Sequence, residues 1–342
     1  MRSILKSQFL SFFNKALNHT SSRSSLSKII NEHNVETPRL QWASNPYYMH
    51  DSGDAPNYSY VVFVTSRFRS GSSALWNMFR HEPSCTAYYE PFNERQWFNK
   101  TKRGSKVDAT HLGIQDYWCE YEELEHLSEF YDERWIDTNL MMDAKSWNPN
   151  MRKYIDELID CSQGIPVLQF NRIDFRLEWL KSNYPNSKII HLYRDPRDQW
   201  CSFLTDKKLM NAENITQTYQ DAFYLDSWCN DLKKFYPFLS TTETPHPYRR
   251  FYYLWCLSYM FGKKFSDYSI SYEDLVSKRN EIDALFAALN WQGYRKDLAQ
   301  FFVKSKQQKW KLYANENWFK DLEVKSDIVL KRHLNLNQIK EL

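Results

Sequence analysis

A strand, a short polar loop and the start of a helix follow one another in the first third of the sequence. The apolar run 60–65 (YVVFVT) has the length and composition of a buried strand. The loop 69–73 (RSGSS) follows at once, and residues 74–79 (ALWNMF) have a helical pattern. In this order, the unpaired amides of the first helical turn and the positive end of the helix dipole face one point. The sequence therefore predicts that a phosphate-like group binds at this loop.

Glycine is scarce around the loop, and this excludes the common nucleotide-binding motifs. Gly71 is its only glycine, and the nearest others are Gly53 and Gly104. The Walker loop needs a second glycine followed by Lys-Ser/Thr, and the dinucleotide and protein-kinase loops need three glycines. The nucleophile elbow of serine hydrolases needs a glycine where this chain has Leu75. Ordinary ATP chemistry and serine-hydrolase chemistry are therefore disfavoured.

A second segment repeats the same order of strand, polar residues and helix. Residues 188–193 (KIIHLY) predict a strand that leads directly into Arg194. Asp195 suits the capping position of a following helix, and Pro196 suits its first turn. Ser202 then lies about two helical turns beyond Arg194. An arginine and a serine so placed can bind one anion together. Two anion sites on one sheet predict a ligand that is phosphorylated at both ends.

These segments resemble the sulfotransferases that use 3′-phosphoadenosine 5′-phosphosulfate. In that family, a 5′-phosphosulfate loop corresponds to residues 69–73 and a 3′-phosphate segment corresponds to Arg194 with Ser202. Two shorter segments, 89–92 (YEPF) and 271–276 (SYEDLV), also match, so the ordered resemblance extends over roughly residues 58 to 290. Arginine at the loop start and paired serines at its end are typical of the carbohydrate, tyrosyl-protein and bacterial branches.

The resemblance implies a fold, a co-substrate and a set of donor-binding residues. The fold would be an α/β domain like those of P-loop NTPases, with a central, mainly parallel sheet flanked by helices. The co-substrate would be 3′-phosphoadenosine 5′-phosphosulfate, leaving 3′,5′-bisphosphoadenosine as product, and no metal is expected. The implied donor-binding residues are Arg69, Ser70, Gly71, Ser72, Ser73, Arg194 and Ser202.

Sulfuryl transfer needs charge stabilisation on the leaving phosphate and a base for the acceptor hydroxyl. The resemblance assigns the first role to Arg69. Glu90, at the end of an expected strand 86–89, is the predicted base, with Glu94 in reserve. The alternative for Glu90 is a structural role as a helix cap or in a lysine ion pair. His111 is expected to be a surface or packed residue.

Other basic residues have alternative interpretations as ordinary surface charges. Lys145 is similar to a lysine near the leaving oxygen in some family members, but a solvated lysine is favoured. Arg197 is expected either to support Arg194 or to pair with Asp198 or Glu178. Four lysines form either a flap over the 3′-phosphate or a charged face of a surface helix: Lys304, Lys306, Lys309 and Lys311.

The sequence also predicts a domain organisation. Residues 1–57 are expected to be a basic leader, with a transit peptide or membrane-surface helix as alternatives, and residues 58–342 the catalytic domain. A helical insertion at about 92–162 is expected to set acceptor specificity. No apolar run reaches the roughly 18 residues of a membrane span. Six dispersed cysteines without metal-ligand spacing favour a reduced, cytoplasmic protein.

The expected activity is transfer of a sulfuryl group to a hydroxyl acceptor, either a carbohydrate or another polar small molecule. A net charge of +3 is too small to indicate a nucleic-acid partner. Two alternatives stay open at this stage: a P-loop-like nucleotide kinase, and a binding protein that keeps the fold without catalysis. The sequence does not indicate an oligomeric state.

Overall fold

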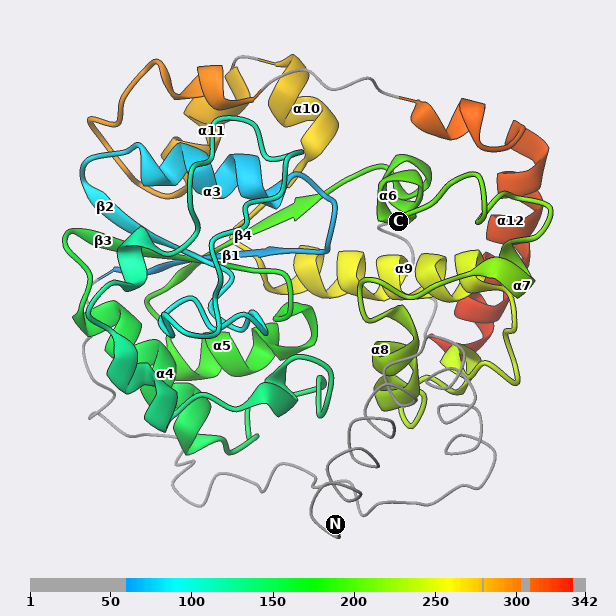
Figure 1. The fold of residues 1–342 in the computed structure, drawn as a ribbon, viewed down its shortest axis with the longest axis horizontal. Helices are drawn as coiled ribbons and strands as arrows, with labels where there is room; N and C mark the ends of the chain where they lie inside the picture. Colours follow the sequence, from blue (N-terminus) through cyan, green and yellow to red (C-terminus); the bar gives the residue numbers. More distant parts are fainter. Residues whose placement is uncertain (1–59, 279, 303–307, 335–342) are drawn as a thin grey trace, which may run out of the picture. The chain divides into compact units, whose positions relative to one another are not determined.

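The computed structural model describes residues 60–278, 280–302 and 308–334. The chain divides into two units, 1–41 and 42–342, and all described residues belong to the second. The core of this second unit is a five-stranded sheet in the order β2-β3-β1-β4-β5, and every neighbouring pair of strands is parallel. The predicted α/β fold with a mainly parallel sheet flanked by helices is confirmed (Figure 1).

Within the described residues the strands are β1 Val62–Ser66, β2 Cys85–Tyr89, β3 Ile165–Phe170, β4 Lys188–Tyr193 and β5 Tyr268–Ser271. The α-helices are α3 Ser72–Arg80, α4 Pro149–Asp160, α5 Leu177–Asn183, α6 Pro196–Phe203, α7 Ile215–Thr218, α8 Leu225–Leu232, α9 Pro247–Phe265, α10 Tyr272–Ser277, α11 Asn280–Ala288 and α12 Glu316–His333. The 3₁₀ helices are η1 Cys119–Tyr121, η2 Glu125–Glu129, η3 Glu133–Trp135, η4 Asp174–Arg176, η5 Pro237–Leu239, η6 Leu298–Phe301 and η7 Lys309–Leu312.

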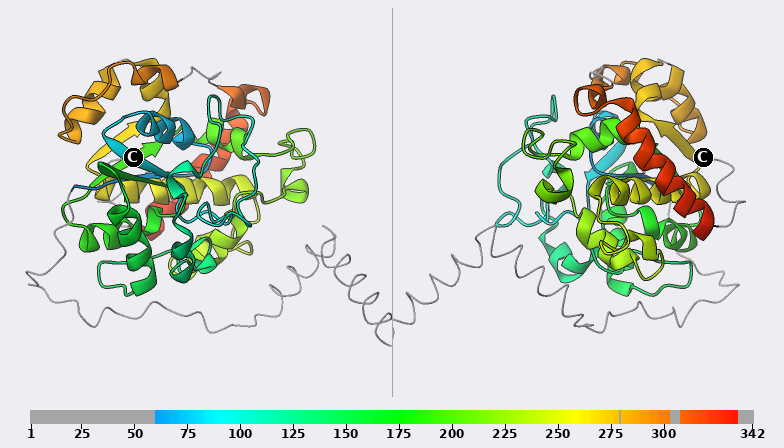
Figure 2. Two further views of the ribbon diagram at one scale, coloured as in Figure 1. Left: turned by 60° about the vertical axis from the view of Figure 1, so that its left-hand side comes forward. Right: turned by 90° about the vertical axis from the view of Figure 1, so that its right-hand side faces the viewer.

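Helices cover both faces of the sheet, and this explains why its central strands are apolar throughout. Helices α3, α10 and α11 lie on one side, whereas α4 and α5 lie on the other (Figure 1). All five residues of β1 are buried, as expected for a parallel strand covered on both faces. Helix α9 packs against α5 and β4, and α12 packs against α9 in turn (Figure 2, right, yellow and red). Because all neighbouring strands are parallel, the carboxyl ends of the five strands lie at one edge of the sheet.

The connection between β2 and β3 differs from the expected helical insertion. Of the predicted helical segment, only α4 is an α-helix, and the preceding part consists of turns and the 3₁₀ helices η1, η2 and η3. Hydrogen bonds from tyrosine side chains to backbone carbonyls hold this connection in place, since it has little regular secondary structure. The hydroxyl of Tyr121 donates to the Tyr89 carbonyl at 3.0 Å, and that of Tyr154 donates to the Pro91 carbonyl at 2.7 Å.

Some predictions concern residues that the structure does not describe. The leader 1–57 lies outside the described residues, as do Lys304 and Lys306. In the part of the chain that the structure describes, no helix has both the length and the apolar content needed to cross a bilayer.

Candidate active site

A cavity of about 630 Å³ opens at the carboxyl edge of the sheet. Its size is that of a small-molecule site. The loops after β1, β2, β3 and β4 all contribute to its wall. The predicted residues that line it are Arg69, Gly71, Ser72, Ser73, Glu90, Glu94, Arg194 and Ser202. The structure thus brings together residues that are more than a hundred positions apart in the sequence.

Gly71 determines the shape of the first loop. It precedes α3 with a φ of 96°, in the left-handed region that favours glycine. A Cβ atom at this position would come within 2.3 Å of the Tyr272 ring, so a larger residue cannot be accommodated without movement. No side chain caps α3. The amides of its first turn are therefore available to an anion in the cavity.

The serines of this loop have different surroundings. The hydroxyl of Ser72 donates to Asn171 Oδ1 at 3.2 Å. The hydroxyl of Ser73 bonds the Tyr89 hydroxyl at 3.0 Å and His111 Nε2 at 3.1 Å. Ser70 is the exception among the predicted donor-binding residues, because its side chain does not line the cavity. It faces a separate, much smaller space, where its Oγ has no hydrogen-bond partner among the described residues.

The second loop contacts the first directly. Arg194 donates through Nη1 to Ser202 Oγ at 3.3 Å and to the Arg69 carbonyl at 3.1 Å. Arg69 in turn donates through Nε to the Ser202 carbonyl at 3.1 Å. The Arg194 guanidinium lies over the Tyr272 ring, 5.1 Å from its centroid. The spacing of Arg194 and Ser202 in the sequence thus reflects a direct contact.

Helix α6 begins differently from α3. Asp195 caps it, accepting hydrogen bonds from the amides of Arg197 at 3.0 Å and Asp198 at 2.9 Å. Pro196 occupies the first turn, as predicted. The Asp195 carboxylate already occupies the N-terminus of this helix. An anion bound at the second loop would therefore contact side chains and not helix amides.

Glu90 lies at the centre of a buried polar network. It directly follows β2 with a positive φ of 40°, an uncommon backbone conformation for a glutamate. Its Oε2 accepts from Arg172 Nη1 at 2.5 Å and from Asn93 Nδ2 at 2.9 Å, and its Oε1 accepts from Asn171 Nδ2. The side chain is 6% exposed. This arrangement fixes the carboxylate in the cavity wall.

Arg172 links the two candidate bases. It pairs with Glu90 through Nη1 and with Glu94 through Nη2, and its own side chain is only 2% exposed. Burial opposes the charged form of Arg172, but the carboxylates of Glu90 and Glu94 outweigh it and raise its pKa. Arg172 therefore stays positively charged. Glu94 is 45% exposed, so it lies at the open side of the same ion pair.

Sequence reasoning missed Asn171 and Arg172, although a signal was present. Strand β3 ends at Phe170, and the two polar residues follow it at once. This is the same order that identified Arg194 after β4. The lysine suggested earlier, Lys145, is exposed and does not line the cavity. The expectation of a solvated lysine agrees with this position.

The structure places His111 in the cavity wall, where it packs against the rings of Tyr89 and Tyr117, in agreement with the expectation of a packed residue. Its Nε2 contacts Ser73 Oγ, and its Nδ1 bonds the Tyr117 hydroxyl at 2.6 Å. Burial, followed by the charge of Arg69, lowers the pKa of His111 below its usual 6.5, although Asp108 acts in the opposite direction. A neutral imidazole is therefore favoured at pH 7.

The structure also corrects the prediction for Arg197. Arg197 pairs with Glu323 of α12 at 2.6 Å and not with Asp198 or Glu178. The Asp198 carboxylate is occupied, since it accepts from the backbone amides of Gln308 at 2.7 Å and Trp310 at 3.3 Å. These two bonds hold the segment that carries the cavity-lining Lys309 against α6. Lys311, in the same 3₁₀ helix, is exposed and does not line the cavity.

The fold and the site define a class of protein before any comparison. A parallel α/β sheet, an uncapped helix after β1 and two adjoining loops that carry arginines are features of a P-loop-like fold. The chain belongs to the sulfotransferase family, whose model matches residues 62–292. This range contains both loops and Glu90. The protein is therefore a sulfotransferase, and by family one that depends on 3′-phosphoadenosine 5′-phosphosulfate.

Comparison with solved structures returns sulfotransferases at low similarity. A sulfotransferase from Alicyclobacillus acidocaldarius is 12% identical, with 80% of this chain and 94% of that chain covered and a TM-score of 0.38. The sulfotransferase domain of the Synechococcus PCC 7002 olefin synthase is 16% identical, with coverages of 86% and 92% and a TM-score of 0.35.

A sulfotransferase from Mycobacterium tuberculosis H37Rv is 14% identical, with coverages of 81% and 77% and a TM-score of 0.36. TM-scores this low add nothing to the family match. No curated protein matches the chain in sequence.

Proposed function

We propose that the cavity binds 3′-phosphoadenosine 5′-phosphosulfate and transfers its sulfuryl group to a hydroxyl of a carbohydrate or another polar small molecule. The observation that carries this proposal is the contact between the two loops. Arg194 bonds both Ser202 and the backbone of Arg69, so two anion-binding groups adjoin in one cavity. A nucleotide with phosphate groups at its 3′ and 5′ positions matches this pair of sites.

The first loop would hold the 5′-phosphosulfate. Open amides at the start of α3 and the hydroxyls of Ser72 and Ser73 are suited to its oxygens. Arg69 would stabilise the charge that develops on the leaving phosphate. In the structure its Nη1 pairs with Asp108 at 3.3 Å, with the two side chains 24% and 43% exposed. An exposed pair of this kind contributes little, so a phosphate can replace it. Ser70 would act through the shape of the loop.

The second loop would hold the 3′-phosphate through Arg194 and Ser202. Arg194 is 9% exposed at its side chain, and its Nε lies 3.8 Å from Glu273 Oε1, too far for a hydrogen bond. Lys309 lines the same cavity, and burial together with the charge of Arg194 lowers its pKa. Two cations beside one cavity, only loosely paired with carboxylates, support phosphate binding here.

Glu90 would take the proton of the acceptor hydroxyl. The acceptor oxygen forms a bond to sulfur, the bond from sulfur to the 5′-phosphate oxygen breaks, and the leaving bisphosphate keeps the electron pair. An ionised carboxylate has about four lone-pair sites, and three of them accept hydrogen bonds from Arg172, Asn93 and Asn171. The acceptor hydroxyl would bind at the fourth, in place of the neighbouring Tyr89 hydroxyl. Arg172 and Asn171 would orient the carboxylate without receiving the proton.

The acceptor side of the cavity combines aromatic and polar side chains. Phe68, Phe223 and Tyr224 contribute rings, whereas Asn93 and Glu94 contribute hydrogen-bonding groups. Aromatic faces beside polar groups suit a ring that carries hydroxyls. Tyr224 has a φ of 63°, a strained conformation of the kind found at functional sites. These features support a carbohydrate or other polar hydroxyl compound as acceptor.

The test is a sulfate-transfer assay on Glu90→Gln with labelled donor and pooled hydroxyl acceptors. Loss of a general base is expected to lower the transfer rate about 10²- to 10⁴-fold. Calorimetry in the absence of magnesium should show that the variant still binds 3′,5′-bisphosphoadenosine as the parent does. Glu94→Gln is the matched comparison, since Arg172 contacts both carboxylates, and it should lose far less activity.

Two results would contradict the proposal in different ways. Full transfer activity in Glu90→Gln would remove Glu90 from the role of base. Failure of the parent protein to bind the bisphosphate without magnesium, combined with magnesium-dependent ATP binding, would instead favour a nucleotide kinase.

A further inference from the structure

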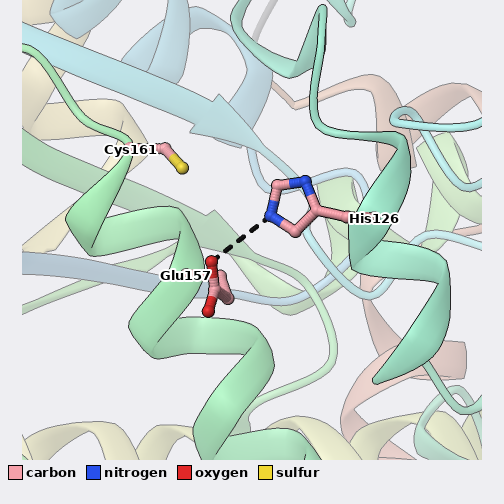
Figure 3. Close-up of side chains that lie close together, drawn as sticks. All are labelled: His126, Glu157 and Cys161. Atoms are coloured by element: carbon pink, nitrogen blue, oxygen red, sulfur yellow. Dashed lines mark hydrogen bonds and ion pairs between the residues drawn. The ribbon is translucent and has the colours of Figure 1, made fainter.

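Three side chains with metal-binding atoms meet on the surface, away from the active-site cavity. His126 belongs to η2, whereas Glu157 and Cys161 lie four residues apart at the end of α4 (Figure 3). The imidazole nitrogen, the carboxylate oxygen and the thiol sulfur lie within 4.8 Å of one another. None of the three residues lines the active-site cavity. The sequence showed no metal-ligand spacing because the histidine comes from a different segment of the chain.

The spacing of these atoms is close to that of a zinc site. In a tetrahedral zinc site with bonds of roughly 2.0 to 2.3 Å, nitrogen and oxygen ligands are separated by roughly 3.3 Å, and a thiolate lies roughly 3.6 Å from either. His126 Nε2 and Glu157 Oε2 are 3.3 Å apart. The Cys161 sulfur lies within 4.8 Å of the other two ligand atoms, so a movement of roughly 1 to 2 Å brings it to bonding distance. Cys161 is exposed, so its side chain has room for this rotation.

The neighbouring residues support this arrangement. Lys153 pairs with Glu157 Oε1 at 2.6 Å, which leaves Oε2 directed toward His126. A partner on the second carboxylate oxygen orients a metal ligand in the same way. Leu127 of η2 and Leu158 of α4 are both fully buried in one hydrophobic cluster. The two segments that carry the ligands are therefore packed in the same core.

We propose that His126, Glu157 and Cys161 bind a zinc ion that links η2 to the end of α4. A nitrogen, an oxygen and a sulfur ligand together fit zinc better than calcium or magnesium, which take oxygen ligands. Three protein ligands leave the fourth position to water. The ion would stabilise the irregular connection between β2 and β3, whose η1 to η3 region has no α-helix among its described residues. It would take no part in sulfuryl transfer.

Proton release accompanies the proposed binding. Zinc takes cysteine as the thiolate, so the Cys161 thiol would give its proton to solvent when the zinc–sulfur bond forms.

The experiment uses the full chain after treatment with a chelator, with Co²⁺ and Zn²⁺ as probes. Co²⁺ should give the near-ultraviolet absorption band of a cobalt–thiolate bond in the parent and in Cys119→Ser, whose cysteine is also exposed and free. The band should disappear in Cys161→Ser. Calorimetry with Zn²⁺ should show affinity lowered by more than about 10-fold in Cys161→Ser and His126→Gln. Zinc should also raise the melting temperature of the parent.

Three outcomes would overturn the proposal. They are no binding of Zn²⁺ by the parent, unchanged binding in Cys161→Ser or His126→Gln, and loss of the cobalt–thiolate band in Cys119→Ser. Far-ultraviolet circular dichroism checks that each variant is folded, and two different ligand variants keep the test valid if one of them fails to fold.

Discussion

The two loops that form the proposed donor site have the same order of elements but would bind anions by different means. After β1, Gly71 leads into α3, whose first turn has no side-chain cap. After β4, the Asp195 carboxylate caps α6 and accepts from two of its amides. The first loop can therefore use helix amides, whereas the second must use the side chains of Arg194 and Ser202. A strand-loop-helix unit does not by itself create a helix N-terminal anion site.

This difference predicts how each loop responds to substitution. A site made of backbone amides depends on the path of the chain and is lost when that path changes. A site made of side chains loses affinity in proportion to the hydrogen bonds removed. Substitutions in the first loop should therefore affect both donor binding and transfer, whereas those in the second should affect mainly recognition of the 3′-phosphate.

Among substitutions in the two loops, the largest effect is expected for Gly71→Ala. The added Cβ would lie 2.3 Å from the Tyr272 ring, and the φ of 96° is unfavourable for alanine. A displacement of about 1 Å in the loop can cost about 100-fold in rate. We expect a loss of this size in the transfer rate, together with weaker binding of the bisphosphate, measured by the labelled-sulfate assay and by calorimetry.

Gly113→Ala is the matched control for this substitution. Gly113 also has a positive φ, 75°, but nothing lies within 4 Å of a Cβ atom built there. Alanine at position 113 therefore has the unfavourable positive φ but no steric clash of its Cβ atom. If Gly71→Ala were no more harmful than Gly113→Ala, close packing against Tyr272 would not be what shapes the loop.

The sequence predicted the parts of this comparison that depend on local signals. Strand β4 has the predicted bounds, and Asp195 and Pro196 start α6 as expected. The spacing of Arg194 and Ser202 predicted that both side chains face one site, and in the structure they are hydrogen-bonded to each other. Such features are set by neighbouring residues, so a pattern search detects them.

The parts that the sequence did not predict depend on the tertiary arrangement. Arg172 reaches Glu90 because β3 lies between β2 and β1 in the sheet, and the order of strands cannot be deduced from local patterns. His111 contacts Ser73 from 38 residues away, through an irregular connection. The two helices also differ in capping, since Gly71 precedes α3 and Asp195 precedes α6. Both residues can be read from the sequence, so this difference was predictable from local signals.

An intermediate effect is expected for Arg194→Ala. A hydrogen bond to a charged group contributes about 1.5 to 3 kcal/mol, which corresponds to about 10- to 100-fold in affinity. Calorimetry should show this loss for 3′,5′-bisphosphoadenosine and a much smaller one for adenosine 5′-monophosphate, which has no 3′-phosphate. Ser202→Ala removes a neutral donor and should cost only about 2- to 10-fold. If Arg194→Ala lowered the affinity for both nucleotides equally, the second loop would not recognise the 3′-phosphate.

The smallest effect concerns pH, because burial shifts the pKa values of titratable groups beside both loops. Beside the second loop, burial raises the pKa values of Asp195 and Glu273. Beside the first loop, burial lowers the pKa of His111 below its usual 6.5, so the folded protein keeps it neutral. As the pH falls through about 6.5, the unfolded chain takes up a proton that the folded protein does not. The stability contributed by neutral His111 is therefore lost toward acid pH.

Replacing His111 with glutamine should make the melting temperature fall less steeply between about pH 7.5 and pH 5.5, where the unfolded histidine titrates. The pKa values of His191, about 3, and His246, about 4, are also lowered by burial, so both residues contribute the same slope to parent and variant. The difference between the two melting curves consequently isolates His111. Thermal denaturation followed by circular dichroism at several pH values measures it, and parallel curves would mean that His111 binds a proton equally well in the folded and unfolded protein.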